Sequence, residues 1–121
     1  MGAIKTHKDL DVWKLGIEMV KMIYKITAQF PEAEKYGLTS QLRRAAVSFP
    51  SNIAVGAARK STKEYLQFLY FSQGSIAEID TQIIIAKELK FIDDVTYESL
   101  DDFLIRLGAM LGGLILSLKR K

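Results

Sequence analysis

Apolar side chains recur along this chain at steps of three and four residues, in four separate segments. This period places them on one face of an α-helix in each segment. In the first segment, Leu10–Ala28, the repeating apolar positions are Val12, Trp13, Ile17, Val20 and Tyr24. The opposite face of that helix carries Lys14, Glu18, Lys21 and Lys25. Phe30 ends the helix, since a residue before proline is driven out of the α region, and residues 31–37 are predicted to form a connecting loop.

The second segment, Leu38–Arg59, continues one apolar stripe past an internal proline. The stripe consists of Leu42, Ala46, Phe49, Ile53 and Ala57. Pro50 removes a backbone hydrogen bond and clashes with the preceding turn. Because the stripe keeps its phase, we favour a single bent helix. The alternative is a second helix that is capped by Ser48 and has Pro50 in its first turn.

Capping side chains mark the starts of the last two segments. Ser61 and Glu64 fit an S-x-x-E capping box, and Asp93 or Asp94 can cap the fourth segment. The third segment carries two apolar rows: Phe68, Ser72, Ile76, Ile79, Ile83 and Ala86, and beside them Leu66, Leu69, Tyr70, Ala77 and Ile84. The fourth segment repeats Tyr97, Leu100, Leu104, Leu107, Leu111, Leu114 and Leu118, a seam of the coiled-coil type.

Four such helices with short connections predict an all-α fold, an antiparallel up-down-up-down four-helix bundle whose second helix is kinked at Pro50. At 121 residues the chain has room for one domain. We expect residues 1–8 to be a flexible leader and residues 9–121 to form the bundle. The longest apolar run, residues 107–118, is shorter than the roughly 20 residues that span a bilayer. With no cysteine and no apolar leader, we expect a cytoplasmic protein.

The third and fourth helices carry more apolar surface than the core of one bundle requires. Outside its seam, the fourth helix holds Phe103, Ile105, Met110 and Ile115. This excess predicts subunit contacts or an exposed apolar patch, and we favour a homo-oligomer. Gly108, Gly112 and Gly113 fit a close contact between helices. The alternative is a loose helix end that packs within one subunit.

Basic residues concentrate in the first half of the chain. Residues 1–60 contain 10 Lys or Arg and 5 Asp or Glu, whereas residues 61–121 contain 7 and 9. A nucleic-acid surface produces such an asymmetry, and so does attraction between the two halves or between subunits. The candidate nucleic-acid contacts are Arg43, Arg44, Arg59, Lys60 and Lys63, with the lysines of the first helix as secondary contacts. The alternative to nucleic-acid binding is that Arg43 or Arg44 forms a structural ion pair with Glu78 or Asp80 on the third helix.

Combinations of side chains that are typical of active sites are missing from the sequence. The only histidine, His7, falls in the predicted leader, and a di-iron bundle would need Glu-x-x-His pairs on facing helices. The acids near the start of the fourth helix fit capping and dipole complementation better than a cation site. We therefore expect no enzyme activity, no cofactor and no metal. A small-ligand carrier would need a polar pocket, for which the candidates are Tyr65, Tyr70, Gln73 and Gln82.

The run LTSQLRRAAVSFPSNIAVGAARKSTKEYLQFLYFSQGSIAE, together with LDVWK at residues 10–14, resembles the bacterial four-helix-bundle proteins encoded by intervening sequences of 23S rRNA genes. The resemblance is carried by Gln41, Arg43, Arg44, Pro50, Asn52, Gly56, Arg59, Ser61, Glu64, Gly74, Ser75 and Glu78. That family is similar to the accessory variability protein of diversity-generating retroelements. The resemblance implies a ring-like homopentamer with a basic surface for nucleic acid or a reverse-transcriptase partner.

These observations lead to two functional hypotheses. The first is a non-catalytic homo-oligomeric scaffold, pentameric by resemblance, that binds nucleic acid; RNA is the expected ligand and DNA stays open. The second is a protein-interaction module that docks a partner such as a reverse transcriptase without touching nucleic acid. The chain has Val55 where the family has glutamate, in NIAVG instead of NIAEG. A glutamate there would pair with Arg59 four residues later, so Val55 leaves this surface more basic and more apolar.

Overall fold

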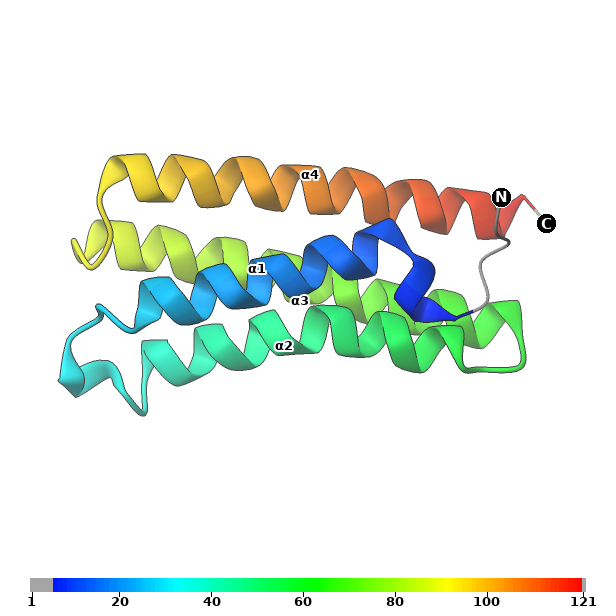
Figure 1. Cartoon of the computed structure of the whole chain (residues 1–121), viewed down its shortest axis with the longest axis horizontal. Coiled ribbons are helices and arrows are strands. Elements are labelled where there is room, and N and C mark those ends of the chain that lie inside the picture. The colour runs from blue at the N-terminus through cyan, green and yellow to red at the C-terminus, as the bar shows by residue number, and fades with distance from the viewer. Residues whose placement is uncertain (1–5, 121) are drawn as a thin grey trace.

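Four long helices make up most of the computed structural model, which describes residues 6–120. The helices are α1 (Asp11–Thr27), α2 (Leu38–Ala57), α3 (Thr62–Glu88) and α4 (Asp94–Lys119), with short 3₁₀ helices η1 (His7–Asp9) and η2 (Glu32–Glu34) before and after α1. Each long helix packs against the next one in the chain, most extensively α2 against α3, and α1 also touches α4 (Figure 1). This arrangement confirms the predicted all-α up-down four-helix bundle.

The leader predicted for residues 1–8 falls largely outside the described residues. Within the described part, the Thr6 side chain caps η1, and the ring of His7 lies edge-on to Trp13 with 5.1 Å between centroids. The boundary of the leader, and its flexibility, stay predictions.

The predicted capping residues begin α3 and α4. Ser61 Oγ accepts a hydrogen bond from the Glu64 N–H at 3.1 Å, and the hydroxyl donates to the Glu64 carboxylate at 3.2 Å. The glutamate thus pairs with the serine side chain, where the capping-box pattern predicts a bond to its backbone. Asp93 Oδ1 accepts from the Thr96 N–H at 2.7 Å. Hydrogen bonding from the Thr96 side chain, and then from its backbone N–H, lowers the pKa of Asp93. Both helices therefore start where local sequence places them.

Pro50 lies inside α2, which runs without interruption from Leu38 to Ala57. This confirms the favoured prediction of one helix through Pro50, and the alternative of a second helix capped by Ser48 is wrong. On one side α1 approaches closely, because a Cβ on Gly16 would come within 2.9 Å of the Phe49 ring. On the other side, the buried Ser72 of α3 donates to the carbonyl of Phe49 at 2.8 Å. Neighbouring helices therefore hold α2 from two sides next to the proline.

The leucine seam of α4 faces the core, as the spacing predicts. Its buried members are Leu100, Leu104, Leu107, Leu111 and Leu118. The prediction that Ile115 lies outside the seam is wrong: Ile115 is buried, whereas Leu114 is only partly buried. The cause is that a 3.6-residue turn drifts relative to a seven-residue repeat.

Apolar side chains remain exposed on α3, on α4 and at the connection between them. The large ones are Tyr70, Phe71, Ile84, Ile85, Leu89, Val95, Ile105 and Leu116. A Cβ placed on Gly108, Gly112 or Gly113 would meet no atom within 4 Å. The close contact expected at these glycines is therefore absent within the described protomer, and a contact between subunits stays a prediction. Across residues 6–120, no helix combines the length and apolar character that crossing a bilayer requires.

Candidate functional site

The five candidate basic residues fall into two groups at opposite ends of α2. Arg43 and Arg44 lie in its first two turns, whereas Arg59, Lys60 and Lys63 surround the connection to α3. At 1.5 Å per helical residue, about 20 Å separate Arg44 from Arg59. One protomer therefore does not bring the five residues into a single cluster.

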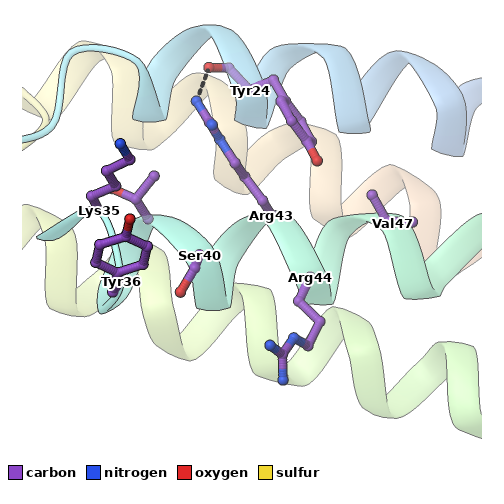
Figure 2. Close-up of a pocket in the computed structure, with 8 residues that line it drawn as sticks. Tyr24, Lys35, Tyr36, Ser40, Arg43, Arg44 and Val47 are labelled. Atoms are coloured by element: carbon purple, nitrogen blue, oxygen red, sulfur yellow. Dashed lines mark hydrogen bonds between the residues drawn. The ribbon is translucent and has the colours of Figure 1, made fainter.

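The first group borders an open hollow of about 540 Å³ between the end of α1, the α1–α2 connection and the start of α2 (Figure 2). Its lining consists of Tyr24, Lys35, Tyr36, Thr39, Ser40, Arg43, Arg44 and Val47. We call this surface the α1–α2 groove. It combines three cations with three exposed apolar side chains, and none of its described lining residues is acidic.

The connection before α2 determines which side chains reach the groove. Oε1 of Glu34 accepts a hydrogen bond from the Leu38 N–H at 3.1 Å, so this carboxylate caps the start of α2. Phe30 is buried and packs on Phe91, with 5.5 Å between ring centroids, which fixes the end of α1. One acid of the connection, Glu34, is thus engaged at a helix start, while Glu32, Lys35 and Tyr36 are exposed.

Arg43 is bound to the last turn of α1. Its Nε donates to Thr27 Oγ1 at 2.8 Å and its Nη2 donates to the Tyr24 carbonyl at 3.2 Å. The guanidinium carbon also lies 4.5 Å from the centroid of the Tyr24 ring (Figure 2). The carbonyl end of a helix attracts a cation, which explains this choice of partner. The ion pair of Arg43 with Glu78 or Asp80, the structural alternative, is not formed in the part of the chain described.

Arg44 and Lys35 are the available cations of the groove. Arg44 is exposed and points away from α1 (Figure 2), and within residues 6–120 it has neither a hydrogen bond nor an ion pair. Lys35 is also exposed, and its Nζ lies 5.6 Å from the Tyr36 ring centroid. Within the groove, therefore, Arg43 has a structural role, while its two neighbours can bind an anion.

In the second group, which consists of Arg59, Lys60 and Lys63, Arg59 covers an aromatic ring of α3. The guanidinium carbon of Arg59 lies 4.8 Å from the Phe68 ring centroid, and Phe68 in turn meets Phe71 edge-on. Gly56 permits this packing, since a Cβ there would come within 2.9 Å of Phe68 Cβ. Val55, at the departure from the family pattern, is 38% exposed. The turn between α2 and α3 thus offers charge, but its nearest aromatic face is occupied.

The residues considered for a small-ligand carrier do not converge on a pocket. Gln82 is buried, and its Nε2 lies 3.4 Å from both Gln41 Oε1 and Glu78 Oε2, whereas Tyr70 and Gln73 are exposed. Burial raises the pKa of Tyr65, which packs against Gly56 and does not line the groove. In the described part of the chain, no three His, Asp or Glu side chains gather in a way that could hold a metal ion.

Sequence reasoning missed the aromatic part of the groove. Tyr24 was assigned to the buried stripe of the first helix, yet it is 43% exposed. Tyr36, in the connection, is 88% exposed. The available signal was the adjacent Lys35–Tyr36 pair, a cation beside an aromatic ring in a polar loop.

Comparison with known proteins places the chain in a family. Residues 8–113 match the family model of the 23S rRNA-intervening sequence protein. The fold is similar to a crystal structure of a protein with unknown function from the S23 ribosomal protein family of Bacteroides thetaiotaomicron, with a TM-score of 0.77 and 19% identity, covering 86% of this chain and 97% of that one. At this identity the likeness supports the fold alone. No curated protein matches the chain. Because the family model spans most of its length, the chain belongs to the 23S rRNA-intervening sequence protein family.

Proposed function

We propose that this protein is a non-catalytic homo-oligomeric scaffold of the cytoplasm that binds nucleic acid, with RNA as the expected ligand. The observation that carries the proposal is the α1–α2 groove, where Lys35 and Arg44 are exposed beside aromatic side chains and no described lining residue is acidic. A planar guanidinium matches two phosphate oxygens at once, and an ammonium adds a compact charge. The groove thus has the composition of a phosphate-binding surface.

Assembly would multiply the weak contacts of a single groove. Two available cations per protomer give low affinity, but a ring of identical subunits lets one strand engage several grooves. The family resemblance implies five copies, and we propose that number. The apolar side chains that stay exposed on α3 and α4, among them Ile84, Ile105 and Leu116, support the proposed subunit contacts.

Light scattering coupled to size-exclusion chromatography tests the assembly. We expect a mass of five protomers, and Ile105→Glu or Leu116→Glu should shift it downward if that face is the contact. A monomer at high concentration would contradict the scaffold.

Filter binding tests nucleic-acid recognition. We expect binding to mixed-sequence RNA at low salt, with affinity that falls steeply as salt rises. The Lys35→Ala/Arg44→Ala variant should weaken binding. A matched control, Lys90→Gly/Arg120→Ala, removes one exposed charge from the α3–α4 connection and one just after α4, and it should not weaken binding. Absence of binding at low salt would overturn the proposal.

A protein-interaction module is the second candidate, with a reverse transcriptase as one partner that the family resemblance suggests. The exposed Val55, next to the Arg59–Phe68 stack, favours it because an apolar group beside a cation suits a protein surface. This module would bind one defined protein and ignore nucleic acid at every salt concentration, so the same filter assay separates the two functions.

A further inference from the structure

We infer that the α1–α2 groove binds an unpaired segment of nucleic acid, with a base stacked on Tyr36 and the flanking phosphates held by Lys35 and Arg44. This inference rests on the proposed nucleic-acid binding and specifies the form of the ligand. It distinguishes a single strand, whose bases can turn toward the protein, from a duplex, whose bases are stacked on each other.

Tyr36 is the side chain that points to a base. At 88% it is the most exposed large apolar side chain among residues 6–120. It stands on the connection between η2 and α2, at one end of the groove (Figure 2). In proteins that bind single strands, aromatic rings of this kind carry stacked bases. The ring face of Tyr36 is thus a platform with no core function.

The second aromatic wall has a fixed position. Arg43 lies over the ring of Tyr24 at 4.5 Å and donates to the Tyr24 carbonyl and to Thr27 Oγ1. These contacts make Arg43 a positioning residue, which orients Tyr24 and adds its charge to the groove. The groove therefore has one rigid wall, on α1, and one projecting ring, on the connection.

The two available cations, Lys35 and Arg44, line the same groove as Tyr36. Lys35 precedes Tyr36 in the chain, and Arg44 lies one helical turn beyond Ser40 on α2. A volume of about 540 Å³ falls within the range of roughly 300–1,000 Å³ that holds small organic ligands. The flexible backbone of a single strand can adjust its phosphates to these two cations, whereas the phosphates of a duplex keep a fixed spacing.

Ring faces beside cations favour a nucleobase over an acidic peptide. Both ligands would satisfy Lys35 and Arg44, but only the base has a flat π-face to place on Tyr36. Competition between the two ligands therefore belongs in the test.

Fluorescence anisotropy of the assembled protein can test the inference. The probes are a 12-nucleotide labelled RNA without secondary structure and the same RNA annealed to its complement. We expect the single strand to bind at least about tenfold more tightly than the duplex. Tyr36→Ala should lower single-strand affinity by about 5- to 150-fold, the range that base stacking on an aromatic ring implies, and should change duplex affinity little. Tyr36→Phe keeps the ring face and should stay within about twofold of the parent.

The controls separate failure of this inference from failure of the proposed function. Each variant must keep the parent's mass by light scattering and its unfolding midpoint. Equal affinity for both probes, unchanged by Tyr36→Ala, would overturn single-strand recognition and leave nucleic-acid binding intact. Binding of neither probe would overturn both. Displacement of the RNA by an equal concentration of a glutamate-rich peptide would assign the groove to an acidic partner and also overturn the inference.

Discussion

Arg44 and Arg59 are both exposed arginines at the ends of α2, yet their surroundings differ. Arg59 lies over its own Phe68 at 4.8 Å, so its charge and the nearest aromatic face satisfy each other. Arg44 has no partner among the described residues and shares a groove with Tyr36, whose side chain is 88% exposed. The other ring of that groove, Tyr24, is covered by Arg43 at 4.5 Å. The two arginines therefore carry the same charge in different surroundings, because the ring nearest Arg59 is covered whereas the groove that Arg44 lines includes an exposed ring.

The two ends of α2 also differ in how they attach to neighbouring helices. At the start of α2, polar contacts hold it to α1, through Arg43 to Thr27 and to the Tyr24 carbonyl. At its end, close packing holds it to α3, through Gly56 against Tyr65 and Phe68. Substitutions should therefore act mainly on stability at the second end and mainly on binding at the first.

Gly56→Val should have the largest effect on stability. Its Cβ would lie 2.9 Å from Phe68 Cβ and 3.2 Å from the Tyr65 carbonyl oxygen, which is backbone and cannot rotate away. We expect a loss of about 1–3 kcal/mol in the free energy of unfolding, measured by urea denaturation. Gly74→Val is the matched control, because nothing lies within 4 Å of a Cβ there, and it should be neutral or slightly stabilising. Equal losses for both variants would show that the close contact does not constrain the end of α2.

The next largest effect is expected on RNA affinity, when each of the two basic groups is neutralised in turn. Lys35→Ala/Arg44→Ala and Lys60→Ala/Lys63→Ala remove the same charge from opposite ends of α2. We expect the first pair to weaken RNA binding by about tenfold or more and to lower the salt slope by up to about 1.4, at about 0.7 per single-strand phosphate contact. The second pair should cost about threefold or less. Anisotropy titrations at several salt concentrations measure both quantities, and equal losses would mean that net charge alone drives binding.

Arg43→Ala should destabilise the protein by about 1 kcal/mol. The variant loses two hydrogen bonds from a charged donor and the stack on Tyr24, but part of this guanidinium contacts solvent. Arg44→Ala, one residue away, should stay within about 0.5 kcal/mol of the parent in thermal or urea unfolding. The opposite ranking would reverse the roles assigned to these neighbours.

The smallest expected effect is on stability and concerns position 55, where this chain has valine and the family pattern has glutamate. Val55→Glu restores an acid four residues before Arg59, an order that stabilises a helix by about 0.2–0.5 kcal/mol. Because Arg59 already lies over Phe68, we expect the gain at the low end of that range. A double-mutant cycle with Arg59→Ala measures the coupling between positions 55 and 59, and a coupling above about 1 kcal/mol would show that the stack does not hold Arg59.

The extent of each helix could be read from the sequence because it depends on local signals. The stripe through Pro50 predicted one helix, and Ser61 and Asp93 predicted where α3 and α4 begin; the structure agrees at all three places. The phase of α4 near its end was harder to predict. A seam drawn at steps of three and four residues predicted Leu114 to be buried, whereas the helix turns Ile115 inward.

The candidate site depended on contacts between residues that are distant in the chain. Nothing near Arg43 in the sequence indicates that Thr27 and the Tyr24 carbonyl are its partners, because this choice follows from the way α1 ends beside α2. Likewise, the apolar stripe of the first helix includes Tyr24, yet this side chain is 43% exposed and its ring is covered by Arg43 of α2. Periodicity and capping therefore determined the helices and their order, since those forces act within a turn or two of the chain. Tertiary packing alone decided which cations are free and which rings face solvent, because each outcome depends on where another helix lies.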